Sequence, residues 1–139
     1  MQGRAFLNVA HELMFGLDEE HWRAACVHAY YALMLECRDA LEGWGRTPAP
    51  RENVHSFVRL QLGYASDPDL KQIHAVLDVL VRRRNQASYQ LVGLAVFATR
   101  RPALDAYQDA RDPLALLDAI QSDPARQVAA IASLPPPPP

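Results

Sequence analysis

Apolar residues recur every three or four positions along most of the chain, and prolines divide it into segments. This spacing predicts amphipathic helices. The predicted helices cover residues 4–15, 19–42, 52–62, 68–89 and 102–121, with a short last helix after Asp123. Pro113 is expected to bend or break the fifth helix, and residues 91–97 fit either a helix end or a buried loop. We therefore expect an all-α bundle of four to five main helices, with one domain at 1–134 and a disordered, solvated proline tail at 135–139.

Aspartates precede three of the predicted helices. Asp18 is followed by two glutamates, while Asp67 and Asp123 each precede a proline. An aspartate side chain can accept hydrogen bonds from the free amides of a first helical turn, and proline suits the first helical position. These residues predict helix starts after Asp18, Asp67 and Asp123.

The second helix is apolar on nearly all sides between Ala24 and Leu35, with His28 as its one conventional polar side chain and two tyrosine phenols beside it. Its small residues would let another helix approach closely. Two explanations are open: a central core helix, or a helix that also forms a dimer interface. Cys26 and Cys37 lie too far apart on this helix for a disulfide and are expected to be buried thiols.

The fourth helix carries a packing stripe that includes an arginine. The stripe consists of Leu70, Ile73, Leu77, Leu80, Arg84, Ala87 and Leu91. A guanidinium on such a stripe needs an acceptor, which could be a carboxylate of the bundle or an arriving phosphate. The residues expected to lie on the same side as Arg84 are Arg82, Asn85, Ser88 and Tyr89. A plainer interpretation of Arg82 to Arg84 is a basic helix end that stabilises the helix dipole.

Composition and charge limit the function classes. Of the 139 residues, 50% are apolar and 22% are charged, and the net charge is −2. This charge gives no global attraction to nucleic acid, so such a role must rest on a local patch. No apolar run is long enough for a membrane span, and the first residues do not resemble a signal peptide. We expect a cytoplasmic protein without membrane contact, and the spacing of histidines and cysteines predicts no metal site or cofactor.

Three short motifs resemble those of HEPN domains. Residues 28–32 read His-Ala-Tyr-Tyr-Ala, residues 53–56 read Asn-Val-His-Ser, and residues 84–89 read Arg-Asn-Gln-Ala-Ser-Tyr. They resemble, in order, the long "AYYA" helix of the superfamily, the start of its next helix, and the signature late in its fourth helix. That signature follows the Arg-x-x-Ala-Asp-Tyr form of a stand-alone subgroup, with Ser88 in place of the usual aspartate. The resemblance covers roughly residues 18–121.

The resemblance implies a helical bundle that forms an antiparallel homodimer with two copies of the arginine motif at one cleft. It implies an RNA-directed toxin or defence component that is a metal-independent endoribonuclease, often paired with a nucleotidyltransferase. By the resemblance, Arg84 would hold the scissile phosphate and Asn85 would orient it, with Arg82, Arg83 and Ser88 binding nucleic acid. These roles suit the chemistry of the side chains.

The third catalytic role of the family, proton transfer, belongs to a histidine, and Tyr89 stands in that place. An ordinary phenol has a pKa of about 10 and is a poor base at neutral pH. Three outcomes are open: Tyr89 is activated by a nearby arginine, another histidine substitutes for it with His28 as the best candidate, or cleavage is absent. Without cleavage, the chain is a non-catalytic module that pairs with a nucleotidyltransferase or another protein. A further alternative is a structural bundle in which Arg84 belongs to an internal ion pair.

Overall fold

The computed structural model describes residues 1–93 and 95–137. Within them the chain forms six α-helices and one short 3-10 helix, and it forms no strand, which confirms the predicted all-α class. The elements are α1 (Ala5–Met14), α2 (Glu19–Gly43), α3 (Val54–Tyr64), α4 (Pro68–Tyr89), η1 (Ala95–Ala98), α5 (Arg101–Ser122) and α6 (Pro124–Ser133).

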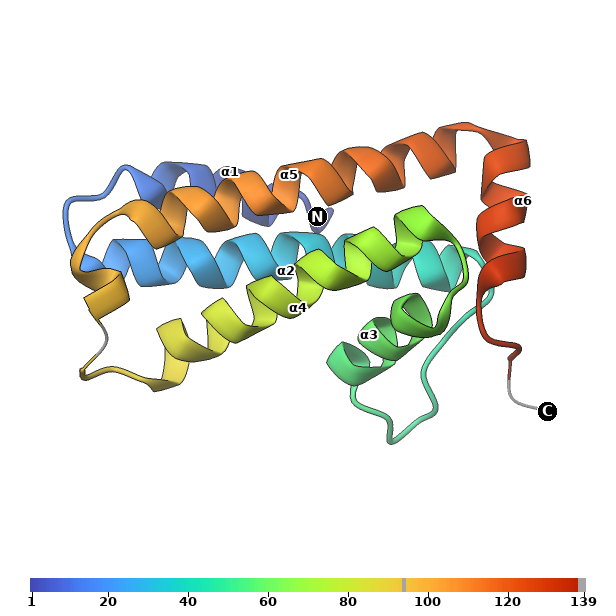
Figure 1. The fold of residues 1–139 in the computed structure, drawn as a ribbon, viewed down its shortest axis with the longest axis horizontal. Helices are drawn as coiled ribbons and strands as arrows, with labels where there is room; N and C mark the ends of the chain where they lie inside the picture. The colour runs from blue at the N-terminus through green and yellow to red at the C-terminus, as the bar shows by residue number, and fades with distance from the viewer. Residues whose placement is uncertain (94, 138–139) are drawn as a thin grey trace.

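Helix α2 is the centre of the bundle (Figure 1). Helices α1, α4 and α5 pack along it, and α3 packs beneath α4 near the carboxyl end of α2. The small residues Ala25, Ala29 and Ala32 have no exposed surface within the single chain. The bundle itself therefore covers them, and the central core helix explains the apolar character of α2 without a second chain.

The packing stripe of α4 is confirmed as far as the helix extends. Leu70, Ile73, Leu77, Leu80 and Ala87 are all buried. Each large aliphatic side chain on this stripe contributes about 2 kcal/mol through burial. Leu91 lies beyond the end of the helix and is 68% exposed. Residues 91–93 are not helical and Phe97 is a buried residue of η1, while Leu94 lies outside the described residues.

Helix starts at the three aspartates are confirmed. Asp18, Asp67 and Asp123 each accept hydrogen bonds from amides of the following turn. The third helix begins at Val54 rather than at residue 52, because the Asn53 side chain accepts from the amides at positions 55 and 56. This N-cap had not been assigned from the sequence.

Helix α5 is continuous across Pro113, so the expected break is absent. Proline lacks the amide that would bond to the carbonyl four residues earlier, but Pro113 is buried within the bundle. Packing on both sides of Pro113 holds the helix together: Ala110, Leu114 and Leu117 are all buried.

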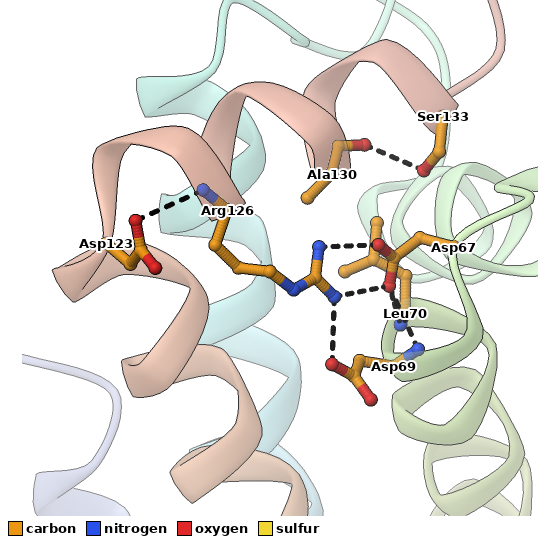
Figure 2. Close-up of polar contacts among 7 residues, drawn as sticks. All are labelled: Asp67, Asp69, Leu70, Asp123, Arg126, Ala130 and Ser133. Atoms are coloured by element: carbon orange, nitrogen blue, oxygen red, sulfur yellow. Dashed lines mark hydrogen bonds and ion pairs between the residues drawn. The ribbon is translucent and has the colours of Figure 1, made fainter.

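Helix α6 stands across one end of the bundle and is attached to the start of α4 (Figures 1 and 2). Arg126 donates to both carboxylate oxygens of Asp67, at 2.6 and 2.8 Å, and to Asp69 at 2.8 Å (Figure 2). The same Asp67 caps α4, so one carboxylate serves a helix start and a contact between helices. The amide of Ser66 donates to the carbonyl of Ser133, which adds a backbone contact.

The proline tail begins directly after α6. Pro135 is half-buried and its carbonyl accepts from Arg46, whereas Pro136 and Pro137 are exposed. Pro138 and Pro139 lie outside the described residues. Among the helices described, none combines the length and apolar character that a membrane crossing requires. Both cysteines are buried free thiols, and burial raises the pKa of Cys26 to about 12.

Candidate functional site

Arg84 projects from α4 onto a group of tyrosines. Its Nη2 donates to Tyr31 Oη at 2.9 Å and its Nη1 donates to Asn85 Oδ1 at 2.9 Å. Its Nε is buried and has no hydrogen-bond partner in the described part of the chain. No carboxylate of the described residues forms an ion pair with it. Of the two acceptors considered from the sequence, a carboxylate of the bundle is therefore not the one used.

Three tyrosine rings surround the guanidinium. Its Cζ lies 5.6 Å from the ring centres of Tyr31 and Tyr89 and 5.8 Å from that of Tyr30. Ring faces attract a cation by roughly 0.5–2 kcal/mol each, which offsets part of the loss of hydration. The positive charge is thus accommodated by neutral groups and is not cancelled.

His55 joins the same tyrosines from α3. Its Nδ1 is 2.6 Å from Tyr30 Oη, its ring stacks on Tyr30 with centres 5.7 Å apart, and it meets the edge of Tyr31 at 5.9 Å. The Asn53 cap fixes the first turn of α3 and so fixes the backbone of His55. Arg84 and His55 consequently contact the same pair of rings, and we call Tyr30, Tyr31, His55 and Arg84 the Arg84 cluster.

The charges of the Arg84 cluster follow from burial. Burial lowers the pKa of His55 below its ordinary value of 6.5, and the charge of Arg84 lowers it further. Burial raises the pKa of Tyr30 to about 12, although Arg84 acts in the opposite direction. At neutral pH His55 is therefore neutral and the Tyr30 phenol is protonated, so Arg84 supplies the positive charge of the cluster.

Of the other residues predicted for the site, some contact Arg84 and others do not. Asn85 and Tyr89 both contact Arg84, and the Tyr89 ring is 71% exposed beside it. Arg82 is exposed, and neither Arg82 nor Ser88 bonds to Arg84. Arg83 is half-buried and does not bond to Arg84; its charge lowers the pKa of Asp109 on α5, although burial, the larger cause, raises that pKa above its ordinary value.

His28 lies one helical turn before Tyr31 but belongs to a different set of contacts. Its Nδ1 bonds to the carbonyl of Ala24 at 2.8 Å, and its ring packs on Phe6 with centres 5.6 Å apart. Phe6 also contacts Tyr31. In the described chain, no hydrogen bond or ring contact joins His28 to Arg84. The structure thus brings His55, rather than His28, into the Arg84 cluster.

Arg23 secures the end of α4, and sequence reasoning did not identify it. It is 8% exposed, and its Nη1 donates to the carbonyls of residues 86, 87 and 90 at 3.1, 3.1 and 2.9 Å. Its Nε bonds to Glu19 at 2.8 Å, and its Cζ lies 4.3 Å from the ring centre of Phe97. An arginine four residues after a glutamate was visible in the sequence, but nothing there indicated that it caps another helix.

The described residues contain no group of three or more histidine, cysteine, aspartate or glutamate side chains placed to hold a metal ion. Comparisons with protein-family models, with curated proteins and with solved structures give no match. The resemblance to HEPN domains therefore rests on the motifs of the sequence, and the function has to be argued from the Arg84 cluster.

Proposed function

We propose that this protein binds the phosphodiester backbone of RNA at Arg84 and acts as a HEPN-type toxin or defence component that cleaves RNA without a metal ion. The observation that carries the proposal is the state of Arg84. Its guanidinium is half-buried, it has no carboxylate partner in the described residues, and its Nε is unpaired. A phosphate is the anion that a guanidinium binds with two parallel hydrogen bonds.

An exposed aromatic ring beside Arg84 favours RNA over a small anion. Tyr89 presents 71% of its surface to solvent while its ring remains in contact with the guanidinium. Unpaired bases stack on such rings, and each stacked base contributes about 1–3 kcal/mol. Arg82 is exposed on the same helix, two positions before Arg84. It adds positive charge near the site, although the net charge of the whole chain is −2. The attraction is therefore local rather than global.

The roles of the motif residues follow from their contacts. Arg84 would stabilise negative charge on the phosphate as the phosphorus gains a fifth oxygen. Asn85 accepts a hydrogen bond from Arg84 and is exposed, so it can orient the guanidinium and donate its own amide hydrogens to the phosphate. Neither role requires a metal ion.

The test is cleavage of a labelled single-stranded RNA with excess chelator by wild type and by Arg84→Ala, purified identically. Loss of one charge-stabilising donor is expected to lower the rate about 100-fold or more. Arg101→Ala is the matched control, because its side chain is 77% exposed and forms only a surface pair with Asp105. Equal cleavage by wild type and Arg84→Ala would show a contaminating nuclease and remove the assignment.

The stability of an Arg84→Gln variant separates this proposal from the structural alternative. If Arg84 served an internal ion pair, its removal would cost several kcal/mol. Because the groups around Arg84 are neutral and their contacts are offset by the cost of burying its charge, we expect a loss of only about 1–2 kcal/mol in the free energy of unfolding. A loss of several kcal/mol in chemical denaturation would favour a structural role.

A non-catalytic module that pairs with a nucleotidyltransferase or another protein is the second candidate. Its supporting observation is a set of exposed apolar side chains on two connections at the same end of the bundle (Figure 1): Phe15, Leu17, Leu91 and Val92. A homodimer also belongs to the proposal, but the small residues of α2 are buried, so it would have to use another surface. Co-purification with a partner, without cleavage by any variant, would favour this candidate.

A further inference from the structure

His55 has one ring nitrogen occupied and one free. Nδ1 is bonded to Tyr30 Oη at 2.6 Å. Nε2 forms no hydrogen bond with any described residue, and it is not among the buried polar atoms that lack a partner. The ring is therefore held on one side by a buried phenol and is accessible on the other side. This is the arrangement of a histidine that exchanges a proton with a bound group.

The His55 ring lies close to the proposed phosphate site, because it contacts the same two tyrosines as Arg84. His55 and Arg84 both contact the rings of Tyr30 and Tyr31, and the charge of Arg84 reaches far enough to lower the pKa of His55. A single phosphodiester and its neighbouring ribose can then meet the guanidinium and the imidazole together. Tyr89 and His28 are less suited: Tyr89 is a phenol, and His28 bonds to its own helix.

We propose that His55, on α3, is the catalytic base of the RNA site, with Tyr30 as the residue that positions it; this rests on the proposed function. Nε2 accepts the proton of a ribose 2′-hydroxyl while the 2′-oxygen forms a bond to the adjacent phosphorus. The bond from phosphorus to the 5′-oxygen breaks, and that oxygen takes a proton from water. The products are a 2′,3′-cyclic phosphate and a 5′-hydroxyl, and the water's hydroxide is neutralised by the proton that His55 releases.

Tyr30 Oη is bonded to Nδ1, and the proposed reaction uses the tautomer of His55 in which Nδ1 carries the proton. When Nδ1–H donates to Tyr30 Oη, the lone pair of Nε2 is free, and the imidazolium formed after proton transfer keeps the same hydrogen bond. Tyr30 has no exposed surface, so its ring cannot swing its hydroxyl into solvent and away from His55. The charged and titratable groups near the pair are Tyr31 and Cys37 on the same helix as Tyr30, Arg84 on α4 and Arg59 on α3.

The test compares His55→Ala with wild type in two assays. One is cleavage of labelled single-stranded RNA under chelator, and the other is fluorescence anisotropy with DNA of the same sequence, which lacks the 2′-hydroxyl and cannot be cut by this reaction. We expect the cleavage rate to fall about 10²–10⁴-fold, with DNA binding unchanged, and added imidazole to restore part of the rate. His11→Gln is the control, because His11 is exposed on α1.

The pH profile and the neighbouring variants add readouts that a structural role would not change. The wild-type rate should rise with pH and level off near neutrality, because His55 must be neutral to act. Tyr30→Phe keeps the stacked ring but removes the hydroxyl, and it should lower the rate less than His55→Ala without changing DNA binding. His28→Gln should cleave like wild type.

The outcomes separate the two proposals. Cleavage by His55→Ala at the wild-type rate, or loss of cleavage in His28→Gln instead, would overturn the role of His55. Equal loss of binding and cleavage in His55→Ala, without rescue by imidazole, would also overturn it. Wild-type protein that binds RNA through Arg84 but never cleaves would reject His55 as a base and leave RNA binding intact. Wild-type protein that neither binds nor cleaves would reject both.

Discussion

Arg23→Ala would remove the guanidinium that holds the carboxyl end of α4. The last carbonyls of a helix lack amide partners within it, and here Arg23 Nη1 donates to those of Ala87 and the C-cap residue Gln90, and also to that of Gln86, which accepts from the amide of Gln90 as well. Alanine would leave the carbonyls of residues 87 and 90 without this donor and would open a space beside Phe97. The change should therefore loosen the turn that carries Tyr89.

The magnitude can be worked from the contacts. A hydrogen bond from a charged donor contributes about 1.5–3 kcal/mol net, and the two hydrogens of Nη1 are shared among three acceptors that can partly return to water. We assign about 2–3 kcal/mol to the three hydrogen bonds of Nη1 together and about 1 kcal/mol to the contact with Phe97. The pair with Glu19 adds little, because that carboxylate is 48% exposed. The expected loss in the free energy of unfolding is about 3–4 kcal/mol, or roughly 10 °C in Tm.

The assay is urea denaturation of wild type, Arg23→Ala, Arg23→Lys and Glu19→Gln. Lysine keeps the charge but lacks the fork of donors, so about half of the loss should remain. Glu19→Gln removes only the surface pair and should cost less than about 1 kcal/mol. If Arg23→Ala and Glu19→Gln lost equal stability, the capping of α4 by Arg23 would be refuted.

Two predictions concern titration. Hydrogen bonds from Arg126 lower the pKa of Asp67, so its folded-state pKa lies below the unfolded value of about 3.8. Asp67→Asn should therefore cost about 2 kcal/mol at neutral pH. Denaturation at several pH values should show this difference shrink below about pH 4 and disappear below the folded-state pKa; a constant difference would contradict the ion pair. For His55, the NMR titration midpoint should lie below 6.5. In Arg84→Gln this midpoint should rise yet stay below 6.5, because burial is the larger cause of the shift. An unchanged midpoint would show that the charge of Arg84 does not reach His55.

The helices could be predicted from the sequence because their determinants are local. The stripe of α4 and the caps at Asp18, Asp67 and Asp123 depend on residues within a few positions of one another. The start of α3 was misplaced by two residues, because the Asn53 cap competes with the helix-forming tendency of the preceding residue. The effect of Pro113 was overestimated, since tertiary packing across α5 outweighs a missing hydrogen bond.

The residues of the candidate site that lie on α4 could be predicted from the sequence, whereas the pairing of Tyr30 with His55 could not. The helical period placed Arg84 on the stripe and Asn85 and Tyr89 near it, because all three belong to one helix. The partnership of Tyr30 with His55 spans 25 positions and depends on how α3 crosses α2. Such crossings follow from packing of whole helix surfaces, which a linear pattern does not encode. His28 was the substitute base proposed from the sequence, but its contacts with Ala24 and Phe6 leave it outside the Arg84 cluster.

The attachment of α6 bears on the order in which the chain folds. Arg126 and Asp67 are 59 positions apart, and the backbone bond between Ser66 and Ser133 spans a similar length. Contacts between such distant positions require closure of a long loop, and this closure costs entropy. During synthesis Asp67 therefore lacks this ion pair until α6 has been made. The same carboxylate that caps the start of α4 thus receives the arginine that attaches α6 to it.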